Sequence, residues 1–303
     1  MAPEAAGTPG ALVYLKLVTV TLLWGGTFIA GRIVSAEVPP MLAATLRFVV
    51  AGVLLLLMAW RMEGGLPRLR PRQMLATLGL GASGIFLYNL CFFSALSHIP
   101  AGRTALIVAL NPIVTTLILA VFFRERTSVA KWGAIALAFT GAAVIITRGD
   151  LAGTLHDVSR SVGAGELYMF LAIIAWAVYT ILGKHALKGL SPLAATTYAV
   201  LWGVLMLGVG AVTELDRVAD FAFTPQTWLS IVYLGALGSA VGFVWYYEGV
   251  KAFGPSRASV FNNLVPVFGV CLAYVILGES ILLSMVLGAA MVIGGVTLAN
   301  RVR

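Results

Sequence analysis

The side chains that could recognise a small molecule are aromatic rings and carboxamides set within long apolar stretches. Tyr88 and Phe92 are four residues apart, as are Asn89 and Phe93, so each pair shares one face of a helix. Aromatic rings stack on an apolar or aromatic ligand, whereas a carboxamide offers donors and acceptors to an ammonium or a carboxylate group. The candidate substrate-binding residues are Trp24, Phe28, Tyr88, Asn89, Phe92, Asn111, Trp176, Tyr179, Phe243, Tyr246 and Asn262. These residue types predict the binding of a ligand, and not the making or breaking of a bond.

Groups that do covalent chemistry are missing from the middle of these stretches. Glu166 and Glu248 fall near the ends of apolar segments, and His98, His156 and His185 fall in loops or at segment ends. An intramembrane enzyme would need catalytic polar residues at depth, and no nucleophile–base set or metal-ligand spacing is visible. We therefore expect no enzymatic activity, no catalytic or metal site and no cofactor. The lack of a midspan carboxylate also favours facilitated, gradient-driven movement over proton coupling.

The composition places the apolar stretches in a membrane. The chain has 303 residues, of which 60% are hydrophobic and 11% are charged, and its mean hydropathy is +0.98. A soluble domain carries about 25% charged residues and needs more polar surface than this chain supplies. About 20 apolar residues are enough for a helix to cross the hydrocarbon core. Ten such spans are predicted, at residues 12–34, 41–60, 73–95, 102–123, 129–147, 164–187, 192–213, 227–250, 257–277 and 280–300.

The distribution of Lys and Arg predicts the orientation of the spans. With the N-terminus inside, the inside segments contain Lys16, Arg61, Arg68, Arg70, Arg72, Arg124, Arg126, Lys131, Lys184, Lys188, Lys251, Arg257, Arg301 and Arg303. The outside loops contain only Arg32, Arg103, Arg148, Arg160 and Arg217. Because cytoplasmic loops retain positive charge, both termini are expected in the cytoplasm and loop 148–163 outside. The net charge of +8 is then a topology signal, and no nucleic-acid partner is expected.

The sequence repeats itself at an offset of about 154 residues. RTALIVALNPIVT, which begins at Arg103, is similar to RASVFNNLVPVFG, which begins at Arg257. Other matched pairs are Pro112 and Pro266, Glu125 and Glu279, Gly141 and Gly295, Trp24 and Trp176, and Pro40 and Pro192. A unit of five spans that begins inside ends outside, so the second copy is expected to be inverted, as in secondary transporters whose central site opens alternately to each side. Residues 1–150 and 151–303 are the two predicted five-helix units.

These motifs resemble the drug/metabolite transporter superfamily in its ten-helix form with two EamA-type repeats. The resemblance is carried by LRFVVAGVLL, by FSALSHIPAGRTALIVALNPIV with FRERTS, and by the partner stretches YEGVKAFGPSRASVFNNLVPVF and LGES. It implies that spans one, three, four, six, eight and nine line a central cavity. The aromatic density along the inner spans is most similar to YddG-type exporters of aromatic amino acids.

Some candidate residues also have a structural interpretation. Trp24 and Trp176 recur near the middle of equivalent spans, which favours the cavity over core packing. Asn111 is expected to face the cavity, whereas Asn262 and Asn263 are equally well explained by hydrogen bonds to a neighbouring helix.

Several other residues are assigned structural roles. Arg47, the one charge well inside a span, is expected to pair with a carbonyl or a carboxylate near the outer face, and a substrate carboxylate is the less favoured partner. Glu125 and Glu279 each precede the start of a span and suit a helix N-terminus. The small residues Ala134, Ala138 and Ala142 form a ridge for close helix packing.

Taken together, the residues predict the export of aromatic or bulky apolar amino acids. Aromatic walls, neutral carboxamides and no fixed charge in the cavity suit a net-neutral zwitterion. A nucleotide sugar would call for Lys or Arg at depth, and a cationic drug for an intramembrane carboxylate. The alternatives are other neutral lipophilic metabolites or drugs and, less favoured, a channel with a continuous pore. We expect a multi-pass protein of the cell (inner) membrane, a monomer without an obligate protein partner, whose partners are a small-molecule substrate and the lipid bilayer.

Overall fold

The computed structural model describes residues 11–122, 128–147, 163–186, 189–218, 222–253 and 261–301, and these residues contain helices and no strand. Six helical stretches are long and apolar enough to cross a bilayer. They are α1 (Ala11–Glu37), α2 (Pro40–Glu63), α3 with η1 and α4 (Pro71–Leu80, Gly81–Leu87 and Tyr88–His98), α9 (Ala164–Ala186), α10 with η3 (Pro192–Ala211 and Val212–Arg217), and α11 with η4 and α12 (Pro225–Tyr233, Leu234–Val241 and Gly242–Phe253).

Shorter apolar helices account for the remaining predicted spans. They are α5 and α6 (Ala101–Val108 and Asn111–Phe122), α7 (Val129–Ile146), η5 and α14 (Asn262–Leu264 and Val265–Leu277) and α15 (Leu283–Arg301). Each predicted span therefore corresponds to a helix or to a run of consecutive helices, and the all-α membrane fold is confirmed. The predicted unit boundary at 150–151, and all of loop 148–163 except its last residue, lie outside the described residues.

Prolines and glycines mark where several helices begin and end. The helices α2, α3, α10 and α11 begin at Pro40, Pro71, Pro192 and Pro225. Proline suits this position because the first turn of a helix leaves its N–H groups unused. Gly64 ends α2 with φ of 71°, and Gly278 ends α14 with φ of 66°. Glycine adopts this left-handed conformation without a steric penalty, so both helices stop where the sequence places it.

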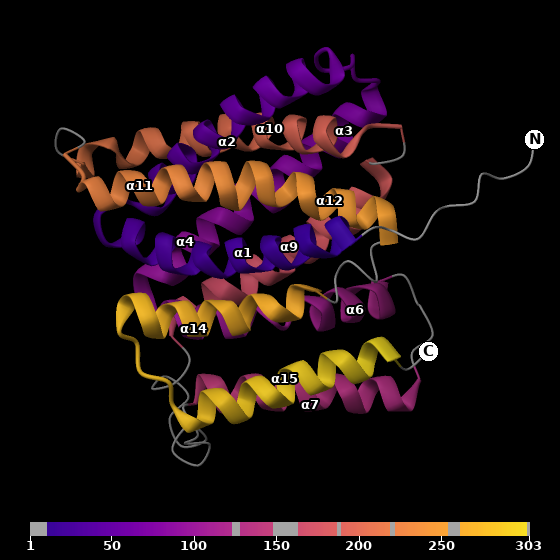
Figure 1. Cartoon of the computed structure of the whole chain (residues 1–303), viewed down its shortest axis with the longest axis vertical. Helices are drawn as coiled ribbons and strands as arrows, with labels where there is room; N and C mark the ends of the chain where they lie inside the picture. The colour runs from indigo at the N-terminus through magenta and orange to yellow at the C-terminus, as the bar shows by residue number, and fades with distance from the viewer. Residues whose placement is uncertain are drawn as a thin grey trace, which may run out of the picture.

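The helices stack roughly antiparallel from one edge of the molecule to the other (Figure 1). α2, α3 and α10 lie at one edge, α7 and α15 at the opposite edge, and α1, α4, α9, α12 and α14 between them. α1 begins and α15 ends on the same side, which we call the near end. The opposite side, where α1 ends and α15 begins, is the far end. By the charge distribution above, the near end is the predicted cytoplasmic side.

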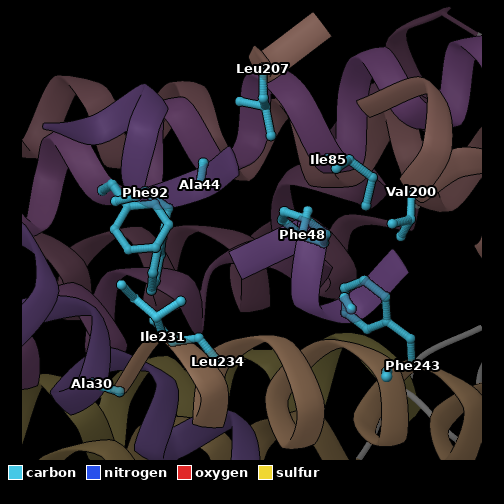
Figure 2. Close-up of a cluster of buried hydrophobic side chains, with 14 of the residues drawn as sticks. Ala30, Ala44, Phe48, Ile85, Phe92, Val200, Leu207, Ile231, Leu234 and Phe243 are labelled. Atoms are coloured by element: carbon cyan, nitrogen blue, oxygen red, sulfur yellow. The ribbon is translucent and has the colours of Figure 1, made fainter. Parts of the chain in front are cut away.

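A buried apolar cluster joins helices from both halves of the chain. Figure 2 shows Phe48 of α2, Phe92 of α4, Leu207 of α10, Ile231 of α11 and Phe243 of α12 in this cluster. Lipid tails are as apolar as these side chains, so the cluster stabilises the fold mainly through close dispersion contacts. It holds in place the helices that surround the cavity described below.

The pair α7 and α15 packs with its backbones in close contact. A Cβ atom at Gly141 would lie 2.6 Å from the carbonyl oxygen of Gly288, and one at Gly295 would lie 2.7 Å from that of Ala134. Ala134 and Ala138 are fully buried, which confirms the predicted close-packing ridge. The two contacts are reciprocal, because Gly141 and Gly295, and likewise Ala134 and Gly288, are equivalent positions at the offset of about 154 residues.

Two kinds of interruption recur in the two halves. The wide π-helical turns of η1 and η4 occupy residues 81–87 and 234–241, nearly the repeat spacing apart. Predicted span 102–123 is not continuous, because α5 ends at Val108 and α6 begins at Asn111, directly before Pro112. In span 257–277, whose first residues are not described, the 3₁₀ turn of η5 leads into α14 next to Pro266. A proline lacks the N–H that would continue the helix, so these positions interrupt it.

Candidate substrate cavity

A central cavity lies among helices α1, α2, α4, α9 and α12 and the interruptions at α5–α6 and η5. It is lined by Trp24, Thr27, Phe28, Arg47, Tyr88, Asn89, Phe92, Val108, Ala109, Asn111, Trp176, Phe243, Asn262, Asn263 and Val265. The structure thus brings together all the predicted site residues except Tyr179 and Tyr246. Those two do not line the cavity, but the ring centroid of Tyr179 lies 5.2 Å from that of Trp176 and the ring centroid of Tyr246 lies 5.2 Å from that of Trp24.

Aromatic side chains from both halves meet in the cavity wall. The rings of Trp24 and Trp176, at equivalent positions of α1 and α9, lie edge to face with centroids 6.1 Å apart. Phe243 lies 6.0 Å from Trp24, also edge to face, and Tyr88 stacks on Phe92 at 5.9 Å with an interplanar angle of 16°. Edge-to-face and offset pairs are the favoured arrangements of aromatic rings. The wall therefore offers fixed aromatic surface to a ligand.

Arg47 of α2 brings a positive charge to this cavity. Its side chain is 4% exposed; Nε donates to Ser239 Oγ at 2.9 Å and Nη1 donates to Asn89 Oδ1 at 2.9 Å. The guanidinium also lies 5.1 Å from the ring centroid of Phe48 and 5.9 Å from that of Phe92. No carboxylate among the described residues lies within ion-pair distance of it.

This geometry meets one expectation and corrects another. A carbonyl or a carboxylate was expected to pair with Arg47, and the side-chain carbonyl oxygen of Asn89 does so, while the hydroxyl group of Ser239 is a partner that was not predicted. The cavity carries a fixed charge, whereas the sequence predicted none. Ser239 was missed because a serine in an apolar span is common, and nothing in its sequence context points to Arg47.

The π-helical turns explain why Ser239 and Asn89 hold the guanidinium. Ser239 Oγ donates to the carbonyl oxygen of Leu234, five residues earlier, at 2.9 Å. Asn89 Nδ2 donates to the carbonyl oxygens of Ile85 at 2.9 Å and Gly84 at 3.2 Å. Every polar atom of the Asn89 amide is therefore engaged, and this residue positions Arg47 while it lines the cavity.

Two other carboxamides have unused acceptors. The Oδ1 atoms of Asn111 and Asn262 are buried and accept no hydrogen bond from any described residue. Both residues line the cavity at helix interruptions. A buried acceptor without a partner is costly, so these two atoms suit the N–H donors of a ligand.

Polar contacts between the two halves tie the far end together. The Glu279 carboxylate accepts hydrogen bonds from the backbone N–H groups of Ala101 and Gly102, both at 2.9 Å. Glu279 therefore caps the N-terminus of α5, a helix of the first half that is distant in the sequence. Its expected role at a helix N-terminus is confirmed, and Glu125 lies outside the described residues. Arg103 of α5 forms an ion pair with Glu166 of α9 at 3.0 Å, also at the far end.

The near end has a cross-half contact of its own. Lys16 at the start of α1 pairs with Glu248 of α12 at 2.6 Å, with side chains 25% and 38% exposed. Lys16 Nζ also lies 5.6 Å from the ring centroid of Trp245.

The chain matches the EamA-like transporter family twice, over residues 11–147 and 163–301. The chain belongs to this family. The uncharacterized transporter YyaM of Bacillus subtilis is 29% identical over 290 residues, which are 96% of this chain and 94% of that protein. A probable terminal-alkyne amino-acid exporter of Streptantibioticus cattleyicolor is 32% identical over 287 residues, which are 94% of this chain and 92% of that protein.

A solved crystal structure shares the fold. It superimposes with a TM-score of 0.63 over 96% of this chain and 97% of its own chain, at 20% sequence identity. The family, its named relatives and the apolar helices together identify a multi-pass membrane transporter, and not an enzyme.

Proposed function

We propose that this protein exports aromatic or bulky apolar amino acids through its central cavity. One observation carries the proposal: a single cavity sets aromatic rings of both halves beside polar groups that have unused hydrogen-bonding capacity. The rings of Trp24 and Trp176 suit a large apolar side chain. The free Oδ1 atoms of Asn111 and Asn262 suit an ammonium group. The name of the Streptantibioticus relative, a probable amino-acid exporter, agrees with this substrate class.

We further propose that transport proceeds by alternating access between two inverted repeats. The support is the internal symmetry of the described residues. The reciprocal contacts of α7 with α15, the two π-helical turns and the two proline interruptions all recur near the repeat spacing. Two inverted copies can exchange conformations, and this exchange exposes a central site to each side in turn.

Counterflow in proteoliposomes tests the substrate class. Wild-type protein is expected to exchange L-tryptophan and L-phenylalanine in a saturable manner, which a channel would not do. Trp176→Ala should weaken apparent tryptophan affinity about tenfold, because stacking alone contributes about 0.5–1.5 kcal/mol beyond burial. Trp228→Ala is the matched control, since Trp228 is 40% exposed and lies outside the cavity lining.

Two results would count against the proposal. Wild-type protein that exchanges no aromatic or bulky apolar amino acid would refute the substrate class. A folded Trp176→Ala protein whose exchange matches that of wild type would refute the assignment of the site.

A further inference from the structure

We propose that Arg47 binds the carboxylate of the substrate and thereby restricts transport to compounds that carry one. This inference rests on the proposed function and deepens it, because it names the group that the cavity requires.

The charge on Arg47 is not balanced by any described residue. The side chain is buried, and its two hydrogen-bond partners, Ser239 and Asn89, are neutral. The described ion pairs, Lys16 with Glu248 and Arg103 with Glu166, lie at the two ends of the molecule and do not reach it. A buried charge without a counter-ion is unfavourable, and an anion that enters the cavity removes this penalty.

The guanidinium retains donors for a carboxylate. It has five N–H groups, and the hydrogen bonds to Ser239 and Asn89 use one on Nε and one on Nη1. The remaining donors include both on Nη2, and Arg47 lines the cavity.

The surroundings fix the direction of these donors. Ser239 and Asn89 are each held by carbonyls of a π-helical turn, and the rings of Phe48 and Phe92 flank the guanidinium. A guanidinium fixed in this way is preorganised for a bidentate carboxylate.

The same cavity then orients a whole amino acid. With its carboxylate on Arg47, the ammonium group has the free oxygens of Asn111 and Asn262 as acceptors. The side chain of the bound amino acid then contacts the aromatic wall that contains Trp24 and Trp176. An amine without a carboxylate leaves the Arg47 charge unpaired and is rejected.

A ligand series on the wild-type protein tests the requirement without any mutation. L-tryptophan and indole-3-propionate, which keep the carboxylate, are expected to raise the melting temperature and to compete for counterflow. Tryptamine and L-tryptophan methyl ester, which lack a carboxylate, should bind at least about tenfold more weakly, as expected for loss of a charge-assisted, bidentate contact. Equal binding of tryptophan and tryptamine would overturn the proposal.

Variants of Arg47 link the requirement to this residue. Arg47→Gln should reduce the ratio of tryptophan affinity to tryptamine affinity at least about tenfold, and Arg47→Lys should reduce it less, because a lysine keeps the charge but not the planar fork. Arg61→Gln, an exposed change at the end of the same helix, should leave the ratio unchanged. A purely structural role would lower both affinities together, and an unchanged ratio in folded Arg47→Gln protein would refute the assignment. If that protein does not fold, the wild-type ligand series decides.

The role of Arg47 and the proposed substrate class can be refuted separately. Wild-type protein that exchanges tryptophan, but with a ratio independent of Arg47, refutes only the role of Arg47. Wild-type protein that binds aliphatic carboxylates, with a dependence on Arg47 but without aromatic substrates, refutes the substrate class and keeps the carboxylate site.

Discussion

Replacing Glu279 by alanine is expected to favour conformations in which the far end of the cavity is open. The Glu279 carboxylate joins the loop before α15 to the first turn of α5, and so joins the second half of the chain to the first. Alternating access requires such contacts to break when the far end opens. Removing the carboxylate therefore destabilises the closed far end and leaves the open one unaffected.

The size of the effect follows from the two hydrogen bonds. Both N···O distances are 2.9 Å, and both donors belong to the first turn of a helix. Loss of an N-terminal cap costs about 0.5–2 kcal/mol, and a hydrogen bond to a charged group contributes about 1.5–3 kcal/mol. Because Glu279 is only half-buried, we take about 1–2 kcal/mol for both bonds together. The population with an open far end should then rise about 5- to 30-fold.

Cysteine labelling of the cavity measures this population. Ala109, which lines the cavity, is replaced by cysteine in a protein without Cys91 and Cys271. A membrane-impermeant thiol reagent added from the far side should then label the Glu279→Ala protein 5- to 30-fold faster, by the estimate above.

A control variant at the near end should favour opening of the near end in place of the far end, and by a smaller amount. Glu248→Gln breaks the pair with Lys16, whose exposed position limits its contribution to about 0–1 kcal/mol. Labelling of Ala109→Cys from the near side should rise by no more than about fivefold. Equal labelling of wild-type and Glu279→Ala proteins from the far side would refute the reasoning.

Two further predictions concern packing and orientation. Gly141→Ala should destabilise the protein by about 1–3 kcal/mol in thermal unfolding, because its Cβ would lie 2.6 Å from a backbone oxygen of α15. The control Gly133→Ala should not destabilise it, because there is open space at its Cβ. Equal melting temperatures of the two variants would contradict this packing. The near end is predicted to be cytoplasmic. In intact cells, a cysteine that replaces exposed Thr213 should therefore react with an impermeant thiol reagent, and a cysteine that replaces exposed Pro67 should not. The reverse pattern would overturn the orientation.

The sequence was sufficient to predict the ten spans and most of the cavity wall. Length and apolar character specify a membrane helix, and Trp24 and Trp176 stood out because both lie near the middle of equivalent spans. The same reasoning placed Tyr179 and Tyr246 in the wall, yet neither lines the cavity. Helical spacing tells which residues share a face, but not which of them border a cavity.

The polar network of the site could not be predicted from the sequence. The meeting of Arg47 with Ser239 and Asn89 depends on π-helical turns, which change the face that later residues present, and no residue pattern announces them. Glu279 was expected at a helix N-terminus, but the sequence did not tell that this helix would be α5 of the other half. Both are contacts between residues far apart in the chain, which a local pattern cannot specify.

The π-helical turn η1 determines which side chains of its helix face the cavity, but it does not determine whether that helix crosses the membrane. Such a turn accommodates a residue beyond the regular α-helical count. The same residues in a regular α-helix, without the wide turn, would still be long and apolar enough to span the bilayer. Each residue of an α-helix advances about 100°, so the part of the helix after residue 87 would then be turned by about that angle. Asn89 and Phe92 would leave the cavity and Arg47 would lose a partner, although the helix would still cross the membrane. Composition decides that this helix spans the membrane, and one wide turn decides which side chains it presents to the cavity.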